Sequence, residues 1–191
     1  MKILVIDDLE KNRASAQEQL GQDHDLTIIG SYKETFDYLW YGDTNLIEKL
    51  MAEKGFPAKN PEPKFIEKTP WDKAFDKVIK SPSVYWDVVL TDAMMPFDYK
   101  AHQHDPGYGE EKMVGYQIAF NAISMGASSA IIFSQHHHQS AEGRILEYSS
   151  LFFGRHFKEI FKFTNGTKLG FFQDTGEVKN WKKALEKLLE S

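Results

Sequence analysis

Three aspartates follow apolar stretches that have the length and composition of buried strands. Asp7 and Asp8 come directly after the apolar run of residues 3–6, and Asp92 ends the run 87–92. In open α/β sheets the carboxyl ends of parallel strands share one edge, and ligands bind there. Neighbouring carboxylates repel one another unless a cation compensates their charge. The three aspartates therefore predict a site for a hard divalent cation at a sheet edge.

The rest of the chain alternates strand-like and helix-like segments, which is the pattern of an α/β protein. Short β-branched or aliphatic runs predict strands, and segments with apolar residues at helical spacing predict helices. The predicted strands are 1–6, 25–30, 86–92, 128–134 and 159–164, and the predicted helices include 9–20, 32–41, 115–123, 140–155 and 177–189.

The segments KILVIDD (2–8) and DVVLTDAMMP (87–96) resemble the receiver domain of two-component response regulators. This resemblance implies an α/β flavodoxin-like three-layer sandwich with a five-stranded parallel sheet of order 2-1-3-4-5. It covers the single domain expected over residues 1–191. It also implies a phosphorelay function in which a histidine kinase or a phosphotransfer protein donates a phosphoryl group.

The resemblance assigns the acidic residues to phosphoryl and metal binding. Asp92 is the implied phosphoacceptor, and Mg²⁺ is the implied cofactor. The implied metal ligands are Asp8 and Asp92 directly, Asp7 through water, and the backbone carbonyl of Met94. A carboxylate is a poor nucleophile toward a phosphoryl dianion until a cation cancels their repulsion, and Mg²⁺ takes oxygen ligands of this kind.

Two further positions follow from the resemblance. Ser134, at the end of the predicted fourth strand, would hydrogen-bond a phosphoryl oxygen. A lysine at the end of the fifth strand would place a positive charge on the same group, and Lys162 is the candidate for this role. Lys158 and Lys168 are the alternatives, because Phe163 stands where the family has proline.

Two segments exceed the usual length of receiver connections. Residues 42–82 carry several prolines, and Thr69 followed by Pro70 has the pattern of a helix start. This insertion is either a partner-docking surface or a connection packed against the sheet edge. Residues 97–113 follow Asp92 and form a candidate lid.

Composition limits the classes of function. The chain of 191 residues has a net charge of −5, which argues against a nucleic-acid surface. It has no cysteine and no apolar run near the ~20 residues of a membrane span. We therefore expect a cytoplasmic protein without nucleic-acid or membrane partners, which signals through a downstream protein.

The predicted function is a stand-alone response-regulator receiver, without a dedicated enzyme activity beyond possible self-phosphorylation and self-dephosphorylation. The alternative is a pseudo-receiver that binds proteins without phosphorylation. A phosphatase of the haloacid-dehalogenase type also uses a strand-end aspartate with Mg²⁺, but it requires a second aspartate two residues after the nucleophile. The histidines at 102, 104 and 136–138 lack the ligand spacing of a zinc site.

Overall fold

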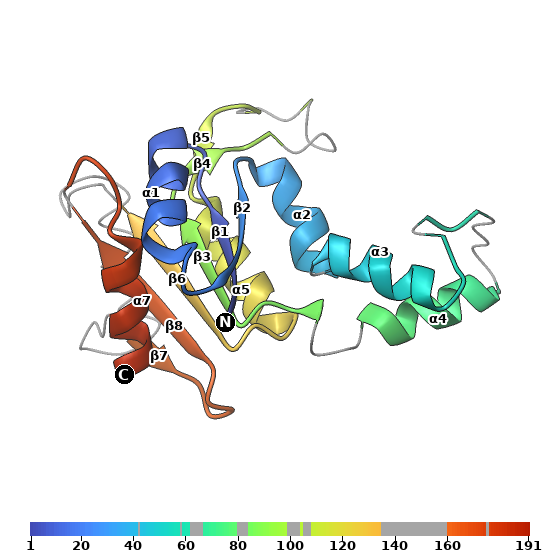
Figure 1. Cartoon of the computed structure of the whole chain (residues 1–191). Coiled ribbons are helices and arrows are strands. Elements are labelled where there is room, and N and C mark those ends of the chain that lie inside the picture. Colours follow the sequence, from blue (N-terminus) through green and yellow to red (C-terminus); the bar gives the residue numbers. More distant parts are fainter. Residues whose placement is uncertain are drawn as a thin grey trace.

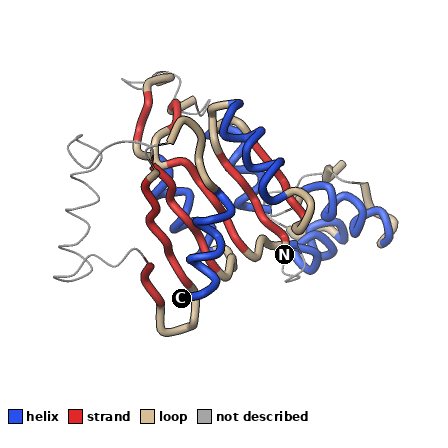
Figure 2. The backbone as a smooth tube through the Cα atoms, turned by 60° about the vertical axis from the view of Figure 1, so that its left-hand side comes forward, coloured by secondary structure: helices blue, strands red, loops and turns tan. Residues whose placement is uncertain are grey.

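In the computed structural model, a six-stranded sheet lies at the centre of the structure (Figures 1 and 2). The structure describes residues 1–41, 43–57, 59–61, 67–79, 84–98, 104, 108–134, 160–174 and 176–191. The strand order is β2-β1-β3-β6-β8-β7. The strands are β1 (Lys2–Ile6), β2 (Asp25–Ile29), β3 (Val88–Asp92), β6 (Ser129–Ser134), β7 (Ile160–Lys162) and β8 (Lys168–Gln173). Every neighbouring pair is parallel except β7 with β8, so the chain has the α/β architecture that its sequence predicts.

The register aligns the ends of the central strands at one edge of the sheet. Ile6 pairs with Thr91, and Asp92 pairs with Phe133 on β6. Ser134, the last residue of β6, pairs with Gln173. The residues that follow β1, β3 and β6 therefore emerge side by side at the carboxyl edge of the sheet.

Helices cover both faces of the sheet (Figures 1 and 2). Alternate residues of each strand point to opposite faces, so Ile3 and Val5 pack on one face while Leu4 and Ile6 pack on the other. The first face is covered by α1 (Glu10–Leu20) and α7 (Trp181–Glu190), and the second by α2 (Tyr32–Tyr41) and α5 (Val114–Ser124). The helices α5 and α7 bury mainly apolar residues, whereas α1 buries Asn12 and Ser15 beside Ala16 and Leu20.

The last two strands differ from the prediction. Residues 159–164 were expected to form the fifth parallel strand, but β7 lies antiparallel at the sheet edge and β8 takes the place beside β6. A turn at Asn165-Gly166 joins the two strands, and Gly166 has a positive φ of 86°. The strand beside β6 must bury side chains on both faces, and β8 contributes the buried Leu169, Gly170 and Phe171, whereas β7 is only partly buried.

The first insertion contains two helices that extend away from the sheet (Figure 1). They are α3 (Thr44–Glu53) and α4 (Pro70–Ile79), and they share a small core of Ile47, Met51, Val78 and Val84. The predicted start of the second helix is confirmed, because the Thr69 hydroxyl accepts a hydrogen bond from the Asp72 amide at 3.2 Å. The ring of Trp71 stacks on Phe75 at 4.6 Å.

A short hairpin next to Asp92 carries the second insertion, residues 97–113. Strands β4 (Met95–Pro96) and β5 (Glu111–Lys112) pair antiparallel, and α5 follows at once. The hairpin thus places Glu111 near the carboxyl edge of the central sheet. Among the described residues, no helix has the length and apolar character needed to cross a membrane.

Candidate functional site

The three aspartates singled out by the sequence come together in the structure. Asp7 and Asp8 follow β1, Asp92 ends β3, and one carboxylate oxygen of each lies within 4.8 Å of the others. Asp7 is fully buried, Asp92 is 8% exposed and Asp8 is half-buried. The cluster therefore opens toward solvent on the Asp8 side.

A lysine that the sequence reasoning did not select completes this cluster. Nζ of Lys179 lies 2.5 Å from Oδ2 of Asp7 and 2.8 Å from Oδ2 of Asp92. The lysine is fully buried, and its ammonium lies 5.8 Å and 5.3 Å from the ring centroids of Phe133 and Trp181. Because a buried carboxylate without a partner is strongly unfavourable, this ammonium is what allows two of the acids to lie in the interior.

The Asp7 carboxylate is fixed from the start of α1. Its Oδ1 accepts a hydrogen bond from the Leu9 amide at 2.9 Å. Asn12, which is fully buried, donates from Nδ2 to both carboxylate oxygens at 3.2 Å. The Arg13 guanidinium donates to the main-chain carbonyls of Asp7 and Asp8, which fixes the backbone after β1.

Asp92 is nearly buried at the end of β3, and its environment shifts its pKa. Its Oδ1 accepts a hydrogen bond from the Met94 amide at 3.3 Å. Burial, with the nearby Asp7 charge, raises the pKa of Asp92 to about 6, although the Lys179 ammonium opposes this rise. Burial therefore favours the protonated form of Asp92 more than water does.

The backbone around Asp92 is tightly packed against the start of α5. A Cβ atom on Gly115 would lie 2.1 Å from the Asp92 carbonyl oxygen. The Gly115 amide donates to the carbonyl of Ala93 at 3.2 Å. Only glycine permits this approach, so Gly115 helps to fix the position of Asp92.

Asp8 is the most accessible acid of the cluster. Partial burial and the Asp7 charge raise its pKa, and Glu111 on the β4–β5 hairpin adds to this effect. Glu111 is exposed. The inserted hairpin therefore brings a further negative charge to the open side of the cluster, which the sequence reasoning did not anticipate.

Ser134 lies at the predicted place, at the end of β6 on the edge where β3 ends in Asp92. It is buried, and its carbonyl accepts a hydrogen bond from the Asp174 amide at 3.1 Å. The strand end and the following β8 segment are thereby joined beside the acidic cluster.

The placement of Lys162 at this site is wrong. Lys162 pairs with Lys168, which in turn pairs with Ser129 at the start of β6, so Lys162 lies at the amino edge of the parallel strands. The hairpin of β7 and β8 is the cause, because it reverses the chain before the strand that borders β6. Lys168 is also remote from the acids, since its Nζ donates to the Leu188 carbonyl at 3.1 Å.

Several sequence predictions fall outside the described residues. These are Lys158, the helix over 140–155, and the histidines at 102 and 136–138. The signal that would have selected Lys179 is its position two residues before the last amphipathic helix, directly after the loop that leaves β8.

The donor set fits a hard divalent cation. It consists of carboxylate oxygens, and Asp8 gives it access from solvent. Asp7 and Asp92 already share the Lys179 ammonium, so a bound cation would add positive charge on the Asp8 side. In comparisons with protein-family models, with curated proteins and with solved structures, no match to this chain was found.

Proposed function

We propose that the chain is a response-regulator receiver that accepts a phosphoryl group on Asp92 in the presence of Mg²⁺. The observation that carries this proposal is the Lys179 ammonium 2.8 Å from Asp92, beside two further aspartates at the carboxyl edge of a parallel sheet. This combination supports the flavodoxin-like fold and the receiver resemblance of the two acidic strand ends. It supplies a nucleophile, a metal-binding acid set and a fixed cation.

The chemistry is an in-line phosphoryl transfer. An Asp92 carboxylate oxygen attacks the phosphorus of the donor and forms a new O–P bond. The P–N bond of a phosphohistidine, or the P–O bond of a small acyl phosphate, breaks, and its electron pair leaves with the donor. Mg²⁺, held by Asp7, Asp8, Asp92 and the Met94 carbonyl, would neutralise charge on the phosphoryl oxygens.

The protein's own groups then stabilise the product. Lys179 gives a positive charge that remains beside Asp92 when the phosphoryl group arrives. Ser134, on the adjacent strand end, would donate its hydroxyl to a phosphoryl oxygen. The change in charge at this edge would alter the surface that a downstream protein contacts.

The proposal extends to the cellular setting. The donor is a histidine kinase or a phosphotransfer protein, the output partner is a protein, and the location is the cytoplasm. The net charge of −5 supports partners other than nucleic acid.

The direct test is intact-mass measurement after incubation with Mg²⁺ and acetyl phosphate. We expect one added phosphoryl group on the wild type and none on Asp92→Asn. Asp87→Asn is the matched control, because Asp87 precedes the same strand and its carboxylate accepts from the Lys2 amide at 2.7 Å. Labelling of Asp92→Asn, or equal labelling without Mg²⁺, would contradict the proposal.

One observation favours the alternative of a phosphorylation-independent protein-binding module. The Lys179 ammonium already pairs with both buried acids, and Asp92 is 8% exposed. A folded wild type that gains no phosphoryl group from acetyl phosphate would select this second function.

A further inference from the structure

Asn12 is a fully buried polar residue that lies between the acidic cluster and the Lys179 segment. Its Nδ2 donates to both oxygens of Asp7 at 3.2 Å, and its Oδ1 accepts from the Lys179 amide at 3.3 Å. Its carbonyl accepts from Nε1 of Trp181 at 2.9 Å. Asn12 therefore contacts Asp7 as well as Lys179 and Trp181, the two neighbours of Asn180.

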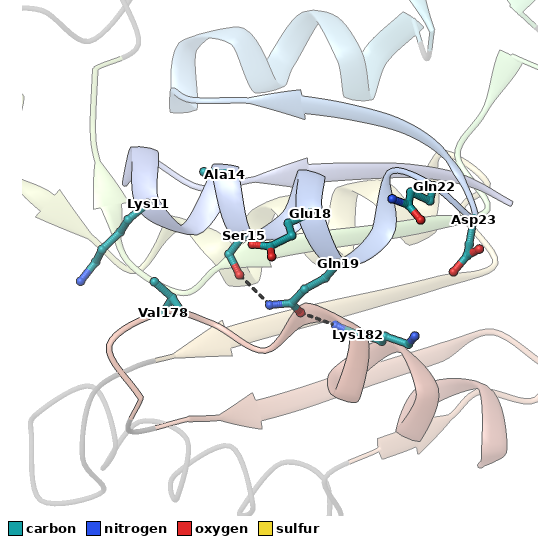
Figure 3. A pocket seen from close by; sticks show the side chains of 9 residues that line it. All are labelled: Lys11, Ala14, Ser15, Glu18, Gln19, Gln22, Asp23, Val178 and Lys182. Atoms are coloured by element: carbon teal, nitrogen blue, oxygen red, sulfur yellow. Dashed lines mark hydrogen bonds between the residues drawn. The ribbon is translucent and has the colours of Figure 1, made fainter.

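The rest of α1 reinforces this attachment. The Ser15 hydroxyl and Nε2 of Gln19 both donate to the Lys179 carbonyl, at 3.1 Å and 3.2 Å. Gln19 also accepts from the Lys182 amide at 3.0 Å, and Figure 3 shows this contact together with the hydrogen bond between Gln19 and Ser15. The amide and the carbonyl of Lys179 are both held by α1, which leaves the residue little freedom of backbone position.

We propose that Asn12 is the positioning residue that places the Lys179 ammonium between Asp7 and Asp92. The inference rests on the proposed function for the use of this ammonium in phosphoryl binding. Asn12 does not touch the reacting group. It acts by fixing the Asp7 carboxylate and the Lys179 backbone in one arrangement.

The physical argument is that Lys179 has a flexible four-carbon side chain with costly rotamer freedom. Two carboxylates alone attract an ammonium but do not fix its direction. When the backbone amide of the lysine and one of its two carboxylate partners bond to the same buried side chain, their separation is fixed. Loss of that side chain would release the lysine segment even though both acids remain.

The test measures Lys179 directly, by pulse labelling of lysine amines with acetic anhydride and peptide mass spectrometry. We expect Lys179 to be protected in the wild type and to react about tenfold faster in Asn12→Leu, as loss of hydrogen bonds of this kind implies. Asn12→Ser replaces the leucine variant if that variant does not fold.

The matched control is Thr35→Val in α2. Thr35 is 1% exposed, and its hydroxyl donates to the Ser31 carbonyl. It should leave Lys179 protected. Equal protection of Lys179 in Asn12→Leu and in the wild type, or equal exposure in Thr35→Val, would overturn the inference.

The same variants separate this inference from the proposed function. In the acetyl phosphate assay we expect Asn12→Leu to slow the phosphorylation of Asp92. In a protein that already carries Lys179→Met, the same substitution should change the rate of phosphorylation by less than twofold. The effects of coupled residues are not additive. Independent effects of the two substitutions would overturn the inference. If the wild type is not phosphorylated while Asn12→Leu exposes Lys179, the proposed function fails and the positioning role stands.

Discussion

Nζ of Lys179 lies 2.5 Å from Oδ2 of Asp7, which is 172 residues earlier in the chain. The contact joins the last loop of the protein to the end of its first strand. Neither side chain is exposed to solvent. The same ammonium also pairs with Asp92, at 2.8 Å, so one lysine compensates two buried carboxylates.

Replacing Lys179 by methionine should strongly destabilise the fold. The change leaves Asp7 and Asp92 buried without their cation, and loss of one partner of a buried ion pair lowers the free energy of unfolding by about 3–5 kcal/mol. Denaturant unfolding measures this. Lys162→Met is the control, because Lys162 is exposed at the opposite edge, and its effect should stay within about 0.5 kcal/mol. Equal effects of the two substitutions would show that the ion pair does not carry this stability.

Protonation of Asp92 should make stability depend on pH in a defined direction. Burial first, and Asp7 next, raise the pKa of Asp92 from 3.8 to about 6. The folded protein then binds this proton more tightly than the unfolded chain. The free energy of unfolding therefore falls as pH rises from about 4 to about 6, by about 3 kcal/mol for this group.

This pH dependence is measured by unfolding the wild type and Asp92→Asn in the presence of a chelator. The wild type should lose stability relative to the variant across this range and show a constant difference above about pH 7. A parallel pH dependence of the two proteins would mean that the pKa of Asp92 is not raised.

Gly115→Ala should destabilise the protein even though Gly115 lies within a helix. Alanine normally stabilises a helix by roughly 0.5–1 kcal/mol relative to glycine. Here the new methyl group would lie 2.1 Å from the Asp92 carbonyl oxygen, so α5 or the end of β3 must move. We expect a loss of about 1–3 kcal/mol and slower phosphorylation of Asp92. A higher melting temperature would refute the close approach.

Glu111→Gln should weaken Mg²⁺ binding through loss of a nearby negative charge. Glu111 raises the pKa of Asp8, so its charge reaches the open side of the cluster. Removal of a single exposed charge should weaken binding by roughly two- to fivefold at low ionic strength and less at high salt. Titration calorimetry measures this. Glu110→Gln is the control, because Glu110 pairs with Lys112 at 2.8 Å. An equal loss of Mg²⁺ affinity in both variants would assign the effect to net charge alone.

Local sequence was sufficient to predict the acidic cluster. A parallel strand that is buried on both faces must be apolar along its length, so the residues that end such strands are recognisable without the tertiary structure. Asp7, Asp8 and Asp92 follow from this rule, as does the position of Ser134 at the end of β6. The helix start at Thr69 follows from another local pattern, a threonine N-cap followed by proline. These predictions depend on spacing over a few residues.

The identity of the lysine required the tertiary structure. Strand propensity identified residues 159–164 as a strand, but it did not determine which arm of the hairpin formed by β7 and β8 borders β6. The choice depends on which arm can bury side chains on both faces of the sheet, and β8 does so with Leu169 and Phe171. As a result, the lysine beside the acidic cluster is Lys179 and not Lys162.

The sequence by itself determined an α/β chain with three carboxylates gathered at one sheet edge, because strand periodicity and strand ends are local properties. Only the tertiary structure decided which lysine pairs with two of them, Asp7 and Asp92, and which helix holds that lysine. Lys179 and Asn12 meet Asp7 through contacts between distant parts of the chain, and no local pattern specifies such contacts. They result from the packing of α1 and α7 on the same face of the sheet.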